Sequence, residues 1–294
     1  MARLAFLGTP EMAVPPLRAL AGAGHDIALC VTRPDRRRGR GSETTPSPVK
    51  VAATELGIPV SHDMDDVAGA GVELAVVVAF GRIIPARLLA AVPMVNLHFS
   101  LLPRWRGAAP VERAILAGDR ETGVCLMKVE EGLDTGPVFA TRRVPIDDHI
   151  TLDALRVELV DVASALVVEA LADGVASLPE PAPQVGEVTV ADKITREDLH
   201  LDWPDAARQL ERVVRLQRAW TTFRGKRLNV LDAVASDGLE SGAGIPGELR
   251  GDEVVTGRGS LRLVRVQPES RSPMSAEEWL RGVRPAVSER LGTD

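Results

Sequence analysis

The chain has 294 residues, of which 45% are hydrophobic and 26% charged, and its formal net charge is −6. These proportions indicate a globular protein with a hydrophobic core, and the acidic balance excludes a surface that is basic throughout, as in proteins that bind nucleic acids or membranes nonspecifically. Because no apolar run approaches the roughly 20 residues of a membrane span and the first apolar stretch is too short for a signal peptide, we expect a cytoplasmic protein without membrane segments.

The first half of the chain alternates short apolar runs with amphipathic helical patterns. Some runs, such as ELAVVVAF at 73–80, lack the polar alternation of a half-exposed strand and therefore indicate strands buried on both faces. The expected strands lie at 3–7, 26–32, 73–80, 95–100, 124–129 and 138–146, and the expected helices at 11–23, 48–56, 111–117 and 152–171. This order predicts an α/β doubly wound domain with a mostly parallel, Rossmann-like sheet.

The composition of the chain changes after residue 176. SLPEPAPQVGEV at 177–188 is rich in proline and has no periodicity, which is typical of a linker. A helical pattern at 204–216 is followed by short strands and turns, which predict a small antiparallel barrel, and the Ser-x-x-Glu of SAEEWLRGV predicts a last helix with a capping box. We therefore predict an N-terminal domain at 1–176, a linker at 177–203 and a C-terminal domain at 204–294.

The motifs of several common active sites are missing from the sequence. Pro10 stands where the dinucleotide-binding fingerprint needs its second glycine, and neither a P-loop nor a Gly-x-Ser-x-Gly elbow occurs. The five histidines lack the spacing of metal ligands, so we expect no metal site. Cys30 and Cys125 lie in apolar contexts, which favour small buried side chains over a disulfide or a nucleophile.

A polar stretch at 96–110, NLHFSLLPRWRGAAP, follows one of the expected strands. If 95–100 is a strand, Asn96 and His98 project to the same side, near the carboxyl end where open α/β sheets bind ligands. A lone histidine on an apolar strand is nevertheless more often a hydrogen-bonded core residue. Asp134, in the tight loop EEGLDTGP at 130–137, could reach this imidazole, but a turn aspartate bonded to its own backbone fits the loop equally well.

An amide, an imidazole and a carboxylate together suit the transfer of an acyl group from one nitrogen to another. The tetrahedral intermediate of such a transfer needs an oxyanion stabiliser, a proton acceptor for the amine and a proton donor for the leaving nitrogen. An asparagine amide and an imidazolium can stabilise the oxyanion, while a carboxylate can stabilise the imidazolium and relay protons through water. This chemistry requires no covalent enzyme intermediate.

A basic loop is the other distinctive feature, in the segment TRPDRRRGRGSETTPSPVK at 32–50. A flexible loop of arginine and glycine suits phosphate backbones, whereas runs of charge are usually solvated surface, and the sequence favours neither reading. The arginines lie within eight residues; they are Arg33, Arg36, Arg37, Arg38 and Arg40.

Six segments together carry a resemblance to a known family. They are FLGTPE at 6–11, RPDRRRGRG at 33–41, TPSPVK at 45–50, SLLPRWRGAAP at 100–110, ETGVCLMKVEEGLDTGP at 121–137 and QPESRSPMSAEEWLRG at 267–282. Asn-x-His, Ser-Leu-Leu-Pro and the aspartate loop are shared by several folate-dependent formyltransferases. RWRGAAP, the arginine loop followed by TPSPVK, and the C-terminal domain are specific to one of them, so the chain resembles the methionyl-tRNA formyltransferases.

This resemblance implies transfer of the formyl group of 10-formyltetrahydrofolate, the co-substrate, to the amino group of methionyl initiator tRNA, with no metal. It implies that Asn96, His98 and Asp134 are the catalytic residues. It also implies a set of folate-binding residues, which are Ile83, Ile84, Ser100, Leu101, Leu102 and Pro103. We expect a monomer.

The resemblance further implies that tRNA is bound by the arginine loop, in which Arg40 is the expected key residue, and by an OB-like C-terminal barrel. The barrel residues implied to contact phosphates are Arg224, Lys226 and Arg227. Three features depart from the family pattern: Ser42-Glu43 where lysines often follow the loop, Phe99 where some relatives have a small residue, and the absence of a Pro-rich turn at 215–223.

Two alternatives stay open on the sequence. The first is another folate-dependent formyltransferase or hydrolase, acting on a small amine or on formyl-folate itself. The second is a non-catalytic RNA-binding protein on the same scaffold. The arginine loop and the C-terminal domain argue against the first alternative, and the intact trio of Asn96, His98 and Asp134 argues against the second.

Overall fold

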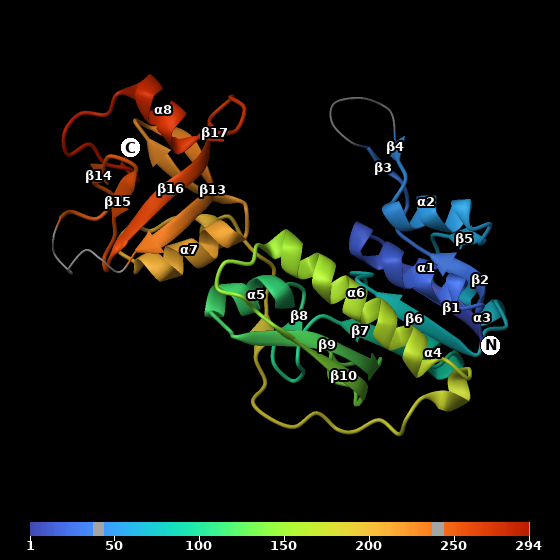
Figure 1. The fold of residues 1–294 in the computed structure, drawn as a ribbon. Helices are drawn as coiled ribbons and strands as arrows, with labels where there is room; N and C mark the ends of the chain where they lie inside the picture. Colours follow the sequence, from blue (N-terminus) through green and yellow to red (C-terminus); the bar gives the residue numbers. More distant parts are fainter. Residues whose placement is uncertain (38–43, 237–243, 294) are drawn as a thin grey trace. The chain divides into compact units, whose positions relative to one another are not determined.

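The computed structural model of the chain describes residues 1–37, 44–236 and 244–293. The chain forms two compact units (Figure 1). The first unit comprises Met1–Val111, Glu121–Pro145 and Leu155–Asp192, and the second comprises Glu112–Arg120, Ile146–Ala154 and Lys193–Asp294. No helix among the described residues is long and apolar enough to cross a membrane.

A seven-stranded sheet forms the centre of the first unit, in the order β10-β9-β7-β6-β1-β2-β5. Its parallel strands are β1 (Arg3–Gly8), β2 (Asp26–Val31), β5 (Val60–Ser61), β6 (Leu74–Val78) and β7 (Met94–His98). The two antiparallel strands are β9 (Glu121–Lys128) and β10 (Val138–Pro145). Every residue of β6 is buried, as its continuous apolar run predicts. The doubly wound, mostly parallel sheet is thus confirmed.

The helices between residues 1 and 177 are α1 (Val14–Gly22), α2 (Pro48–Glu55), α3 (Asp66–Gly69), α4 (Ala86–Ala91), α5 (Pro110–Ala117) and α6 (Leu152–Ala170), with the 3-10 turns η1 (Glu11–Ala13) and η2 (Val175–Ser177). Most of α5 belongs to the second unit. The helix expected at 11–23 therefore begins as a 3-10 turn. Pro15 and Pro16 lie in the first turn of α1, where a missing backbone N–H breaks no helical hydrogen bond. The sequence patterns did not predict α3 or α4, which are too short to show a clear period.

Two short strand pairs complete the first unit. β3 (Arg36–Arg37) and β4 (Thr44–Thr45) form an antiparallel pair that extends away from the main sheet (Figure 1). β8 (Arg106–Gly107) pairs in parallel with β11 (Val190–Ala191), which lies in the predicted linker. Ala182 of the same segment exchanges both backbone hydrogen bonds with Val138. The chain from 182 to 191 is therefore held against the first unit by its own backbone donors and acceptors.

The second unit is built around an antiparallel sheet in the order β12-β13-β16-β15-β14, with β17 beside β16. The strands are β12 (Ala219–Phe223), β13 (Lys226–Ser236), β14 (Leu249–Arg250), β15 (Glu253–Val255), β16 (Ser260–Pro268) and β17 (Met274–Ser275), and the helices are α7 (Ala207–Arg215), α8 (Ala276–Val283) and the 3-10 turn η3 (Glu197–Leu199). No strand pair in the described part of the chain joins β12 to β14, so closure into an OB-like barrel stays a prediction.

The connection between α7 and β12 explains how the chain manages without a Pro-rich turn at 215–223. Gln217 adopts a left-handed backbone conformation with φ of 61°, which reverses the chain within three residues. Beyond this turn, Trp279 of α8 packs edge-on against Phe223 of β12, with 5.0 Å between the ring centroids. This contact lies in the hydrophobic core of the second unit.

The capping box predicted for the last helix is confirmed. The Ser275 hydroxyl accepts a hydrogen bond from the Glu278 backbone N–H, and the Glu278 carboxylate accepts one from the Ser275 N–H, each at 3.1 Å. We expect Ser275→Ala to lower the free energy of unfolding by about 1 kcal/mol, because it leaves a helix N–H without its partner. Urea unfolding measures this loss, and Ser272→Ala, just outside the helix, is the control. Equal stability of the two variants would contradict the prediction.

Candidate active site

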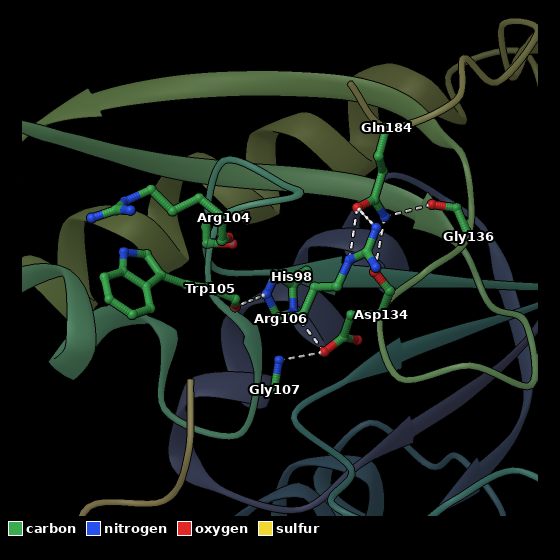
Figure 2. Close-up of polar contacts among 9 residues, drawn as sticks. His98, Arg104, Trp105, Arg106, Gly107, Asp134, Gly136 and Gln184 are labelled. Atoms are coloured by element: carbon green, nitrogen blue, oxygen red, sulfur yellow. Dashed lines mark hydrogen bonds and ion pairs between the residues drawn. The ribbon is translucent and has the colours of Figure 1, made fainter. Parts of the chain in front are cut away.

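His98 ends β7 and is buried, with only 5% of its surface exposed. Its Nε2 atom lies 2.8 Å from the Trp105 carbonyl oxygen. A carbonyl only accepts hydrogen bonds, so Nε2 carries a proton and donates it to this oxygen. Nδ1 is the other ring nitrogen, and it is left to contact a second group. It lies 3.5 Å from Asp134 Oδ2 (Figure 2).

Asp134 lies in the loop between β9 and β10, and its side chain is 15% exposed. Its backbone is left-handed, with φ of 50°, a conformation that aspartate adopts more readily than most residues. Besides facing His98, Oδ2 accepts a hydrogen bond of 2.9 Å from the Gly107 N–H (Figure 2). The carboxylate thus binds outside its own turn, and the two readings that the sequence left open are decided in favour of a contact with the imidazole.

The loop that supplies the partners of His98 and Asp134 is itself fixed by neighbouring hydrogen bonds. The Trp105 N–H donates to the Thr189 hydroxyl at 2.8 Å, and the Ser100 hydroxyl donates to the Arg104 carbonyl at 2.6 Å. Trp105 has a φ of 62°, which turns its carbonyl oxygen toward His98. The geometry around the imidazole therefore depends on Thr189, a residue of the predicted linker.

Asn96 precedes His98 by two residues in β7 and is half-buried. Since side chains alternate along a strand, Asn96 and His98 project from the same side of the sheet, as predicted. The strand ends at His98, so Phe99 and Ser100 lie outside it, whereas the sequence pattern extended the strand to residue 100. Phe99 is buried.

The residues implied to bind folate have different surroundings. Ser100 and Pro103 are buried, while Leu101 and Leu102 are half-buried. The Ser100 hydroxyl is already bonded to Arg104, so it shapes the loop. Ile84 is buried in a core cluster, whereas Ile83 is 87% exposed. The structure therefore places the two isoleucines differently, and contact with folate stays a prediction for all six residues.

Two contacts close the base of the arginine loop. The Thr32 and Ser47 hydroxyls are 2.7 Å apart, and Lys50 Nζ lies 2.7 Å from Asp35 Oδ2. Both pairs join the start of the segment to its end, so the two ends of the loop are held together.

The structure places only some of the loop arginines. Arg33 is half-buried beside Gly81, where an added Cβ would lie 2.4 Å from Arg33 Nη2. Arg36 is exposed, and Arg37 is described by its backbone in β3. Arg38, Arg40, Ser42 and Glu43 lie outside the described residues.

The three residues implied to contact phosphates in the C-terminal unit differ in the hydrogen bonds and ring contacts that they make within the protein. Arg224 donates two hydrogen bonds to the Glu289 carboxylate, which raise the pKa of the guanidinium and lower the pKa of the carboxyl. Arg227 is exposed and lies over the Trp220 ring, 5.1 Å from its centroid. Lys226 is also exposed, at the start of β13. Arg227 Nε also donates to Asn229 Oδ1 at 2.9 Å, so Arg227 is bonded to a neutral amide where Arg224 is bonded to a carboxylate.

Neither cysteine suits nucleophilic catalysis. Both are buried free thiols; burial raises the pKa of Cys30 to about 12 and also raises that of Cys125. Both side chains therefore stay protonated at neutral pH. Among the described residues, no group of three His, Cys, Asp or Glu side chains is close enough to hold a metal ion.

Comparisons with known proteins identify the family of the chain. The family model for formyl transferase matches residues 2–171, and that for the formyl transferase C-terminal domain matches residues 193–284. A methionyl-tRNA formyltransferase of Ruegeria pomeroyi is 41% identical over 95% of this chain and 97% of its own length, and one of Rhizorhabdus wittichii is 45% identical over 95% of each chain. The chain belongs to the methionyl-tRNA formyltransferase family.

Solved structures show that this fold extends beyond the methionyl-tRNA formyltransferases. The methionyl-tRNA formyltransferase from Clostridium thermocellum matches 81% of this chain and 96% of its own with a TM-score of 0.57 and 17% identity. HypX from Aquifex aeolicus, solved in complex with tetrahydrofolic acid, matches 98% of this chain with a TM-score of 0.63 and 20% identity. This chain spans about half of HypX, 48% of its length.

Sequence reasoning missed several residues around the His98–Asp134 contact of this methionyl-tRNA formyltransferase family member. Thr189 and Gln184 lie in a stretch read only as a linker, and Arg106 had no assigned role. The one available signal was the presence of hydrogen-bonding side chains in a stretch otherwise rich in proline. That signal does not indicate which element of the fold the side chains contact.

Proposed function

We propose that the protein transfers the formyl group of 10-formyltetrahydrofolate to the amino group of methionine on initiator tRNA. The observation that carries the proposal is the buried contact of His98 with Asp134, in which the Trp105 carbonyl sets the tautomer of the ring. Names of relatives that are 41% and 45% identical over nearly the whole chain support tRNA as the acceptor. The folate complex of HypX supports a folate as the donor.

The three residues implied as catalytic take different parts in the proposed reaction. The methionyl amine attacks the formyl carbon, and the folate nitrogen leaves from the tetrahedral intermediate. In the arrangement described, both nitrogens of His98 face protein oxygens, so an imidazolium acts on the oxyanion through its charge, while the Asn96 amide supplies the direct hydrogen bond. Asp134 stabilises the imidazolium and accepts the amine proton, directly or through a water that it orients, and this proton is then returned to the leaving folate nitrogen.

The decisive experiment incubates the protein with 10-formyltetrahydrofolate and methionyl initiator tRNA and measures formyl-methionine on the tRNA. Free methionine and an amino sugar nucleotide serve as alternative acceptors, and release of formate without an acceptor measures hydrolysis. Formylation of the tRNA alone supports the proposal. Formylation of a small amine, or hydrolysis of the folate, would instead identify another folate-dependent enzyme, and binding of the tRNA without any turnover would identify an RNA-binding protein.

The arginine loop is proposed to bind tRNA, with Arg40 as its key residue. We expect Arg40→Ala to weaken tRNA binding and to lower the slope of log K against log salt by about 1, because one phosphate contact and its counterion release are lost. Titrations at several salt concentrations measure this slope. Arg87→Ala is the control, since Arg87 lies on α4, outside the loop, and is paired with Asp65. An unchanged slope in Arg40→Ala would indicate that the residue is solvated surface.

A further inference from the structure

Gln184 uses the whole hydrogen-bonding capacity of its carboxamide. Its Oε1 accepts from Arg106 Nε at 3.0 Å and from Arg106 Nη2 at 2.7 Å. Its Nε2 donates to the backbone carbonyls of Asp134 and Gly136, at 2.8 Å each. An amide offers two donors and two lone pairs, so all four are engaged. Gln184 is half-buried, whereas the next residue, Val185, is 87% exposed.

The partners of Gln184 belong to the two backbone segments that hold the His98–Asp134 contact (Figure 2). Arg106 stands between Trp105, whose carbonyl accepts from His98, and Gly107, whose N–H donates to Asp134 Oδ2. The other two partners are the Asp134 and Gly136 carbonyls in the aspartate loop. One side chain therefore joins the segment that orients the imidazole to the segment that carries the carboxylate.

We propose that Gln184 is a positioning residue that sets the separation between His98 Nδ1 and Asp134 Oδ2, a role that rests on the proposed function of this pair. The left-handed backbone of Asp134 is a conformation that residues other than glycine rarely adopt, so contacts from outside the loop help to hold it. The two hydrogen bonds from Nε2 hold the carbonyls of the loop in this conformation. The two bonds accepted by Oε1 keep the Trp105–Gly107 segment against the loop. We call these four hydrogen bonds of Gln184 the clamp; Arg106 supplies the two donors on one side of it, and the Asp134 and Gly136 carbonyls are the acceptors on the other.

The loss of this clamp is expected to change turnover more than substrate binding. Since a misplacement of about 1 Å can cost on the order of 100-fold in rate, we expect Gln184→Ala to lower kcat by about 10- to 100-fold. The KM values for the folate and the tRNA should change by less than about threefold, because all four hydrogen-bonding positions of the Gln184 amide are engaged within the protein. Val185→Ala is the matched control, since it changes the exposed neighbour in the same segment.

A second variant separates the two halves of the clamp. Gln184→Glu keeps an oxygen for Arg106 but has no hydrogens for the Asp134 and Gly136 carbonyls, which its carboxylate would repel. We expect Gln184→Glu to be as slow as Gln184→Ala. Wild-type kcat in Gln184→Glu would show that the donors are dispensable and would overturn the proposal.

Two measurements distinguish positioning of the pair from a general structural role. In a double-mutant cycle, Gln184→Ala should have little further effect on kcat when Asp134 is already replaced by asparagine, because the contact it positions is gone. In protein labelled with 15N-histidine, the His98 ring nitrogens, assigned with the His98→Gln variant, should shift in Gln184→Ala and stay unchanged in Val185→Ala. An undiminished rate loss in the Asp134→Asn background, or unmoved His98 resonances, would overturn the proposal.

The spectroscopic measurement needs no activity, so it tests positioning separately from function. If the wild-type protein fails to formylate methionyl-tRNA but the His98 resonances move in Gln184→Ala, the proposed function is wrong and the positioning role stands. If the wild-type protein is active and the resonances do not move, the proposed function stands and the positioning role of Gln184 is wrong.

Discussion

Replacement of Asp134 by asparagine is expected to lower kcat for formylation of methionyl-tRNA by about 100-fold or more, with little change in stability. Asparagine tolerates the left-handed backbone of this position and keeps an oxygen for the Gly107 N–H. It lacks the negative charge that faces His98 Nδ1 at 3.5 Å, and it cannot accept the amine proton. The loss of turnover in Asp134→Asn therefore measures the effect of the negative charge, because the conformation of the loop is kept.

Single-turnover rates with saturating folate and tRNA measure this effect, and urea unfolding checks the fold. His98→Ala should reduce turnover by a similar factor, because the charge at the oxyanion is lost. It should also be less stable than Asp134→Asn, since it leaves the Trp105 carbonyl without its hydrogen bond. Wild-type turnover in Asp134→Asn would remove the carboxylate from the mechanism.

A second large effect is expected at Gly107, whose backbone φ of 125° is accessible to glycine almost alone. A Cβ at this position would lie 2.8 Å from the Ala191 carbonyl oxygen, so β8 and β11 would have to separate. The Gly107 N–H would then leave Asp134 Oδ2. We expect Gly107→Ala to lower formyl transfer by about 100-fold and the free energy of unfolding by about 2 kcal/mol or more.

Gly186 offers a matched control for this variant. Its φ is 127°, close to that of Gly107, but the nearest atoms to an added Cβ are those of Pro103, at 3.7 Å. Gly186→Ala therefore carries a similar backbone strain without a collision. It should lose stability but keep most of its turnover, as measured by urea unfolding and the formylation assay. Equal losses of turnover in the two variants would show that strain, and not the position of the Gly107 N–H, limits the reaction.

Patterns within single elements predicted most of the fold. The continuous apolar runs of β1 and β6 indicated strands buried on both faces, and the expected strands and helices of the first half end within three residues of those observed. Ser275 and Glu278 marked the start of α8 because a capping box lies within one helical turn. These features depend on neighbours a few residues away, which the sequence displays directly.

The surroundings of the candidate site depended on residues far apart in the chain. The sequence suggested that Asp134 could reach His98, but an ordinary turn aspartate suited it equally well until the strand order β10-β9-β7 brought the aspartate loop to the end of β7. The exposure of Ile83 and the burial of Ile84 likewise followed from packing, since adjacent identical residues look alike in a sequence.

By itself, the sequence determined the apolar periodicity of the strands and helices, the cap of the last helix and the residue types available for formyl transfer. Only the tertiary structure decided which of those residues meet. Gln184 contacts the Asp134 carbonyl across 50 residues of chain, and it looked like part of a linker because proline-rich, aperiodic segments give no local sign of their partners. Hydrogen bonds of this kind are satisfied between elements, so they become visible only when the sheet order and the path of the linker are known.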